Sequence, residues 1–253
     1  MHFFVLTLGL LAFAVDAFAI VDVHDEYFAN PDESRFSVFA FDFSGASGNK
    51  EENNFELENH SIYRGNTATW MFVGSMNFAE TNNVESENNA FAHLRYVRPI
   101  NAGPHGFELL AQYSQDQFEL LDQRIVFGGG YRFKWKPGSD TERGLLGAGV
   151  IREHERYVDI GREQRLWRGN FYVTVSNPVN FARDASISFS TYAQPALKDV
   201  SDIRAIGVMT VKAKLSERLG VRFSLDFRYD SEPEDTIEST NFSYSTGITY
   251  TLK

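Results

Sequence analysis

Strict alternation of apolar and polar residues over long segments is the feature that most constrains this chain. In the stretch VRFSLDFRYD, Val221–Asp230, bulky apolar residues occupy one parity, while Arg, Ser and Asp occupy the other. Successive side chains of a β-strand point to opposite faces, so this segment has one apolar face and one charged face. A fold that contains it must offer apolar surroundings on one side and polar surroundings on the other.

The same pattern runs along the chain in segments of about 10–15 residues, separated by turn-type clusters. It predicts about twelve strands, an even number, as in single-chain outer-membrane barrels. The predicted strands are Arg35–Phe43, Asn53–Tyr63, Asn66–Phe78, Val84–Arg98, Gly106–Phe118, Leu121–Trp135, Gly144–Arg156, Glu163–Ser176, Phe181–Pro195, Val200–Leu215, Leu219–Asp230 and Glu238–Leu252.

Strand length distinguishes a membrane barrel from a soluble sandwich. Strands of globular proteins are most often about five or six residues long, whereas a tilted strand needs about 9–11 residues to cross a bilayer. Because hydrocarbon offers no partners to backbone groups, a membrane-spanning sheet must close on itself. We therefore expect an all-β fold, a single antiparallel transmembrane β-barrel with its apolar parity toward lipid and its polar parity lining the lumen.

The connections alternate in character. Arg64–Asn66 and Ser216–Gly220 are tight, whereas Ser44–Asn53, Ala79–Ser86 and Ser231–Thr240 are longer, polar and mostly acidic. Membrane barrels have short periplasmic turns and longer external loops. With both ends of the barrel sequence in the periplasm, this pattern predicts short periplasmic turns and longer acidic external loops.

The N-terminal residues predict export. Phe3–Val15 is apolar, and Ala17–Ala19 has the A-x-A form of a signal-peptidase site. We expect a signal peptide at 1–19, a lead-in at 20–34 and an outer-membrane β-barrel at 35–253, in the cell outer membrane of a Gram-negative bacterium. A buried N-terminal helix is the alternative for the first segment.

Composition excludes several classes of function. The 253 residues include no Cys, which excludes a disulfide framework, a zinc-thiolate site and a Cys nucleophile. The formal net charge of −10 argues against a nucleic-acid partner. The six His residues form no HExxH motif. We therefore expect no cofactor, no metal site and no nucleic-acid partner.

Two segments carry a family resemblance. RGNTATWMFVGSMNF contains Gly65-Asn66-Thr67 at the start of a long predicted strand, and LSERLGVRFSLDFRYDSEPEDT contains the turn Leu215–Leu219 before the penultimate strand. Over Asn66–Leu252 the chain resembles the salt-induced outer membrane proteins, a domain of unknown function from Gram-negative bacteria. The resemblance implies an outer-membrane barrel and supplies no activity or catalytic residue.

Strand direction predicts which charged residues line the lumen and at which height. In the periplasmic half we expect Arg95, Arg132, Lys134, Lys212, Lys214 and Arg222 inward, facing Glu108 and Asp184. In the external half we expect Arg124, Arg168, Arg204 and Arg228 against Asp116, Asp122, Asp202, Asp226 and Asp230. Trp70, Trp135 and Trp167 lie near strand ends, where aromatic girdles form. Gly128, Gly130, Gly147 and Gly149 are expected inward, giving room in a narrow lumen.

Three functions fit these features. The first is a narrow passive pore for small solutes or ions, with an anion preference set by Arg132, Lys212 and Arg222, because basic rings favour anions. The second is a structural or surface-interaction barrel plugged by its own ion pairs. The third is a hydrolase with a Ser beside His93 or His154, although the chain has no G-x-S-x-G motif. The expected partners are outer-membrane lipid and the outer-membrane assembly machinery.

Overall fold

The computed structural model describes residues 34–46, 52–101, 103–117, 120–136, 143–157, 162–178, 185–233 and 237–252. The predicted signal peptide, nearly all of the lead-in and Asp184 lie outside these residues. Within the described ranges, no helix is long and apolar enough to cross a membrane.

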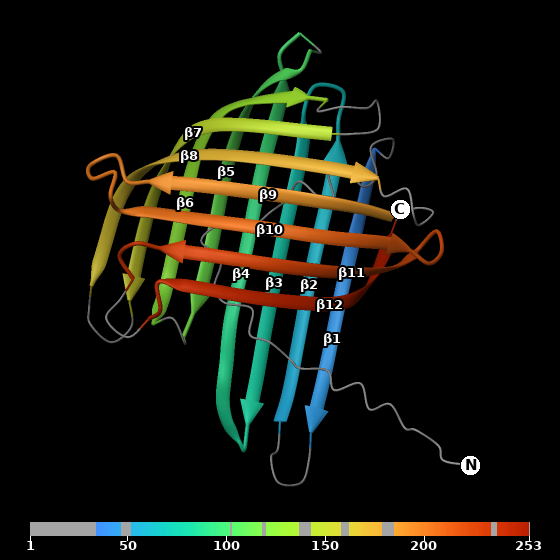
Figure 1. Cartoon of the computed structure of the whole chain (residues 1–253), viewed down its shortest axis with the longest axis vertical. Coiled ribbons are helices and arrows are strands. Elements are labelled where there is room, and N and C mark those ends of the chain that lie inside the picture. The colour runs from blue at the N-terminus through green and yellow to red at the C-terminus, as the bar shows by residue number, and fades with distance from the viewer. Residues whose placement is uncertain are drawn as a thin grey trace.

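In the described residues, twelve antiparallel strands form a closed barrel, which confirms the predicted fold (Figure 1). Each strand pairs with its neighbours in sequence, and β12 returns to pair with β1. The strands are β1 (Arg35–Ala46), β2 (Glu52–Arg64), β3 (Thr69–Thr81), β4 (Val84–Pro99), β5 (His105–Asp116), β6 (Leu121–Trp135), β7 (Arg143–Tyr157), β8 (Glu163–Pro178), β9 (Ala185–Pro195), β10 (Ile203–Lys214), β11 (Leu219–Asp230) and β12 (Thr240–Leu252).

The strands are strongly inclined to the barrel axis. In Figure 1, β8–β12 cross in front of β1–β4, which run behind them at a large angle. We call the end of the barrel at which β1 begins and β12 finishes the near end, and the opposite one the far end. The hairpin connections alternate between these two ends, because every pair of neighbouring strands is antiparallel.

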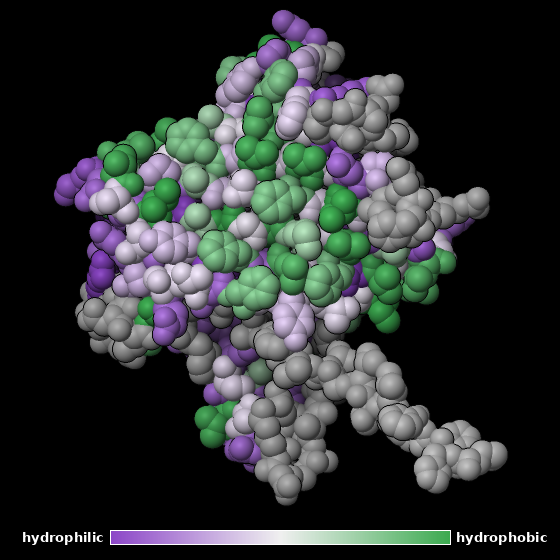
Figure 2. All heavy atoms as spheres, in the orientation of Figure 1, coloured by the Kyte–Doolittle hydropathy of each residue, from purple (hydrophilic) through white to green (hydrophobic). Residues whose placement is uncertain are grey.

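The outer face is apolar and the inner face is largely polar. In β11, Phe223 and Phe227 are exposed on the outside, while Ser224 between them is buried. Figure 2 shows apolar side chains gathered across the middle of the face formed by the front strands, with hydrophilic residues toward the edges of the molecule. This is the arrangement that the alternation in Val221–Asp230 predicted, since that outer face suits lipid.

The connection predicted at Ala79–Ser86 is wrong. β3 continues to Thr81 and β4 starts at Val84, so only Asn82 and Asn83 form the turn. Both residues have positive φ, 51° and 60°. Two-residue hairpin turns with positive φ at both central positions match the twist of paired strands, and Asn tolerates this conformation well. The acidic residues predicted in a loop belong to the strands.

The inward position predicted for Asp122 is also wrong. The register between β6 and β7 shifts between Leu121 and Gln123. As a result Leu121 is buried at 6% exposure, while Asp122 is exposed and pairs with Arg156 on β7 at 2.5 Å. A β-bulge inserts one residue and re-aims the side chains around it, so simple parity failed at this strand end.

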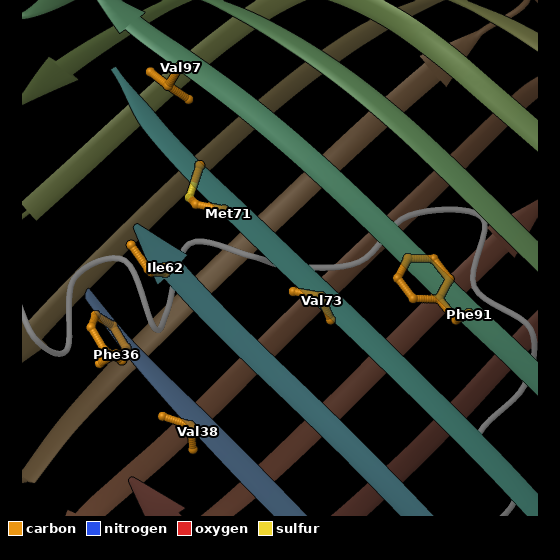
Figure 3. Packing of buried hydrophobic residues seen from close by; sticks show 7 residues of the cluster. All are labelled: Phe36, Val38, Ile62, Met71, Val73, Phe91 and Val97. Atoms are coloured by element: carbon orange, nitrogen blue, oxygen red, sulfur yellow. The ribbon is translucent and has the colours of Figure 1, made fainter. Parts of the chain in front are cut away.

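The inner face of β1–β4 departs from the expected polar lumen. Seven buried apolar side chains from these four strands form one cluster, shown in Figure 3: Phe36, Val38, Ile62, Met71, Val73, Phe91 and Val97. They share a face because they lie on the same parity of neighbouring paired strands. Toward the near end, the first four strands therefore carry apolar residues on both faces, and most of the interior charges belong to β4–β11.

Candidate functional site: the barrel interior

The far half of the interior holds a cluster of charged groups centred on Glu153 of β7. We call it the Glu153 cluster; its members are Arg124, Glu153, Glu155, Arg168, Asp202, Arg204 and Asp230. They come from β6, β7, β8, β10 and β11 and from the loop before β10. Glu153, Glu155, Arg124 and Arg168 are each 1% exposed.

Glu153 contacts three guanidinium groups. Arg124 donates to its Oε2, Arg168 Nε donates to Oε1 at 3.0 Å, and Arg204 Nη1 lies 3.0 Å from Oε1. Each of these arginines also contacts a second carboxylate. Arg124 Nε lies 2.9 Å from Glu155, and Arg204 donates two hydrogen bonds to Glu155, at 2.5 and 3.2 Å.

The outer partners of the cluster are aspartates near the far rim. Arg168 holds Asp202 through two hydrogen bonds, at 2.8 and 3.2 Å, and Arg204 Nε donates to Asp230 at 2.7 Å. The Ala196 N–H donates to the Asp202 carbonyl at 2.8 Å and so closes the loop that presents this carboxylate. In the same loop, the Ser201 hydroxyl and backbone N–H donate to Asp199 and lower its pKa.

The charges of the Glu153 cluster nearly balance, with one more carboxylate than guanidinium group. Three guanidinium groups face four carboxylates, and every arginine contacts more than one of them. Buried charges are tolerated only when they are paired with good geometry. The cluster therefore ties β6, β7, β8, β10 and β11 together and fills part of the far half of the interior with side chains.

A second group, the Glu108 cluster, contains Arg95, Glu108, Arg132 and Tyr172. Arg95 Nη1 lies 3.6 Å from Glu108, and the Tyr172 hydroxyl donates to Glu108 at 2.9 Å. The Arg95 guanidinium also lies over the Tyr172 ring, 5.4 Å from its centroid. Arg132 is 1% exposed and acts electrostatically on Tyr172. The tyrosine thus links β8 to β5 on the inner wall.

Inward glycines on β6 and β7 make room for that link. A Cβ on Gly147 would overlap the Tyr172 ring, and one on Gly130 would lie 2.6 Å from the Ala148 carbonyl. Gly130 and Gly149 are direct partners across the two strands. The room that the sequence predicted at these glycines is occupied, at Gly147, by a tyrosine ring and elsewhere by the close approach of neighbouring backbone.

The predicted lumen residues differ in exposure. Arg95 and Arg132 are buried, whereas Lys134, Lys212, Arg222, Asp226 and Arg228 are half-buried, and Lys214 is exposed at the end of β10. All of them lie on the inward parity of their strands. Arg222 pairs with Glu58 of β2 at 2.5 Å, a partner that the sequence analysis did not name.

The three tryptophans lie at strand ends on the outward parity. Trp70 is 43% and Trp167 is 50% exposed. Trp135 is half-buried, because its ring lies against Gly144 of β7. Trp70 packs against Tyr96 with ring centroids 4.7 Å apart, and Arg152 lies over Trp167.

Glu153, Glu155 and Glu58 were missed as interior residues. For the two β7 residues a signal was present. Gly147 and Gly149 were assigned inward, and Glu153 and Glu155 share their parity in the same uninterrupted strand. The apolar run before them hid this periodicity, because it is apolar on both faces.

The candidate hydrolase histidines contact other polar groups. His93 Nδ1 lies 3.3 Å from Gln112 and its Nε2 accepts from Arg95, while His154 lies 2.7 Å from Glu163 on the outer parity. In the part of the chain that the structure describes, no group of three His, Asp or Glu side chains is placed to hold a metal ion.

Comparisons with known proteins match the fold. The model of a family described as "Protein of unknown function, DUF481" matches residues 40–252. Among solved structures, the NanC porin has a TM-score of 0.52 at 10% identity, covering 86% of this chain and 100% of the porin. The translocator domain of the autotransporter NalP from Neisseria meningitidis has a TM-score of 0.47 at 11% identity, covering 90% and 91%. A search of curated proteins finds no match.

Proposed function

Because this chain belongs to the DUF481 family of proteins of unknown function, we propose its function from the geometry of the barrel: a narrow passive channel of the outer membrane that prefers small anions. The family description carries neither an activity nor a link to salt. The structural likeness to a porin supports the barrel fold, and at 10% identity it supports nothing more.

The observation that carries the proposal is the charge of the inner wall. The whole chain has a formal charge of −10, yet guanidinium and ammonium groups recur on the inward parity from β4 to β11. Toward the near end, Arg132 and Lys212 accompany Arg95 and Arg222, of which Arg95 contacts Glu108 and Arg222 contacts Glu58. Rings of basic side chains favour anions in pores, and low-dielectric walls strengthen their field.

The Glu153 cluster favours the second candidate, a structural barrel plugged by its own ion pairs. Its three arginines are matched by four carboxylates and fill part of the far half. In the channel proposal the same cluster forms a constriction in the far half. The preference for anions is then set by the basic residues toward the near end. In the plugged alternative the barrel passes no ions.

Reversal potentials in a planar bilayer test the proposal. Under a salt gradient, purified refolded protein should give a reversal potential of the sign expected for anion preference. Replacing Arg132, Lys212 and Arg222 together by Gln should move that potential toward zero. The matched control replaces the exposed cations Arg156, Arg165 and Arg218 by Gln, with the same change in net charge.

The outcomes separate the candidates. A cation preference, or a reversal potential that the interior triple variant leaves unchanged, refutes the anion channel. An equal shift in the control variant would show that overall charge, rather than the lumen, sets the preference. Absence of conductance from protein that is folded in the bilayer establishes the plugged barrel instead.

A further inference from the structure

The seam between β1 and β12 is paired along only part of its length. Its ladder runs over four residue pairs, from Ser37–Leu252 to Ala40–Thr249. Yet β1 continues to Ala46, paired with β2 throughout, and β12 starts at Thr240. Within the described strands, no ladder pair joins Phe41–Ala46 to Thr240–Ile248. In Figure 1 the two strands meet near the C-terminus and then separate, β1 descending behind while β12 crosses the front.

Side chains beside the unpaired part are exposed on the outside and only partly buried on the inside. Phe41, Ile248 and Phe242 on the outward parity are 61%, 62% and 65% exposed. The inward residues of β12 are only half-buried, whereas inward Ser190 of β9 is 0% exposed. A Cβ on Gly247 would meet nothing within 4 Å. The seam therefore combines the shortest ladder between neighbouring described strands with an inner face of β12 that is only half-buried.

An ion pair crosses the seam on the inside, at the height where the ladder ends. Glu58 is the partner of Ala40 on β1, and Arg222 is the partner of Gly247 on β12. The two charged groups meet at 2.5 Å above these small residues. We call this pair the clasp. His60 Nε2 lies 2.7 Å from the same Glu58 carboxylate. The clasp joins β2 to β11 across β1 and β12, and so limits how far the seam can separate.

An open seam has a physical consequence in a membrane. Unpaired backbone N–H and C=O groups cannot face dry hydrocarbon without a large cost. They need polar partners that can sit in a wall whose outside is apolar. A molecule with a polar head and one hydrocarbon chain suits such a wall, because its head can hydrogen-bond to these backbone groups from the lumen side while its chain faces the lipid.

We propose that the β1–β12 seam is a lateral opening through which single-chain amphiphiles with a charged or zwitterionic head pass between the lumen and the lipid phase. The hydrocarbon chain lies between Phe41 and the outward residues of β12, while the head contacts the inward hydroxyls of Ser243 and Ser245 and the charges of the clasp. This inference rests on the proposed channel, to which it adds a substrate class and a route.

Locking the seam tests the proposal. The chain has no cysteine, so introduced pairs are the only thiols. Phe41→Cys with Ile248→Cys would extend the existing register by one pair. The matched control is Phe39→Cys with Tyr250→Cys, residues that are already partners in the ladder. The probe is a fluorescent lysophosphatidylcholine added outside vesicles that contain the protein and enclose albumin, which captures the probe inside.

The expected result is that oxidation of the 41/248 pair reduces probe capture to the rate of protein-free vesicles, and that reduction restores it. The 39/250 pair should capture at the unmodified rate in both states. Capture that the oxidised 41/248 pair does not slow, or that both pairs slow equally, overturns the lateral route.

Nitroxide labels at the same two pairs provide a measurement that does not depend on forming the disulfide. In lipid, the 39/250 pair should show strong dipolar broadening and the 41/248 pair much weaker broadening. Equal broadening would mean that the seam is closed, and broadening between chains labelled only at position 248 would mean that a second copy pairs there; either result overturns the proposal. Ion conductance recorded from the same preparations reports separately on the channel, so each idea can fail without the other.

Discussion

Removing the charge of Glu153 should destabilise the barrel more than any neutral change of similar burial. Glu153→Gln keeps the size of the side chain and leaves no cavity, so the effect isolates the charge. Glu153 is 1% exposed, and two of its arginine contacts are at 3.0 Å. At an effective dielectric constant of about 20, each such contact is worth about 5 kcal/mol before desolvation is subtracted.

The remaining contacts of the three arginines place the expected loss of stability near the lower end of the range for broken buried ion pairs. Breaking a buried ion pair costs about 3–5 kcal/mol, mostly because a charge is left unpaired. Here Arg124 keeps Glu155, Arg168 keeps Asp202, and Arg204 keeps Glu155 and Asp230, so no guanidinium loses all its partners. We therefore expect Glu153→Gln to lower the free energy of unfolding by about 3 kcal/mol.

The assay is equilibrium urea unfolding in lipid vesicles, followed by tryptophan fluorescence. The control is Ser190→Ala, which removes a hydrogen bond of 2.9 Å to Thr174 between two residues that are both 0% exposed. A neutral hydrogen bond contributes about 1 kcal/mol. If Glu153→Gln cost no more than Ser190→Ala, the view that the cluster ties the far half of the barrel together would be refuted.

Three further outcomes are expected. Leu225→Arg should cost about 2–4 kcal/mol because it faces lipid, and Ser224→Arg, on the inward parity beside Asp226, should cost less; equal losses in urea unfolding would contradict the facing assignment. Gly147→Ala should destabilise by about 1–3 kcal/mol because its Cβ overlaps the Tyr172 ring, and an unchanged unfolding midpoint would show that the ring moves freely. The native barrel should migrate differently in SDS before and after boiling, because backbone pairing along the other strand ladders resists unfolding by the detergent; identical migration would contradict a stable barrel.

The alternation of β11 and the constraint of hydrocarbon were enough to predict the barrel. Leu121–Trp135 and Leu219–Asp230 have the predicted bounds, because turn residues flank periodic segments there. Sequence reasoning failed where local geometry departs from simple alternation. The Asn82–Asn83 turn looked like a long loop because its flanking strand residues are polar, and the bulge at the start of β6 reversed the facing of Asp122.

For the barrel interior, the sequence predicted which residues point inward, but it did not predict which of them contact each other. Parity indicates that Arg124 and Arg204 point inward, but barrel tilt decides which carboxylate stands at the same height. Arg204 therefore meets Glu155, 49 positions away in sequence, and Arg222 meets Glu58 across the closing seam. Such pairings depend on register across several strands, and no single strand contains that information.

The two apolar faces of β1–β4 have a consequence for the life of the chain before it reaches its membrane. The inner cluster of Figure 3 and the exposed outer side chains, such as Phe72 and Met76 of β3, leave the near-end part of these strands with apolar residues on both faces. An unpaired sheet edge with apolar surfaces is a template for aggregation. β1–β4 precede β5–β12 in the chain, and their inner side stays uncovered until the later strands have joined the barrel. The first third of the chain should therefore depend most strongly on periplasmic chaperones and on the outer-membrane assembly machinery.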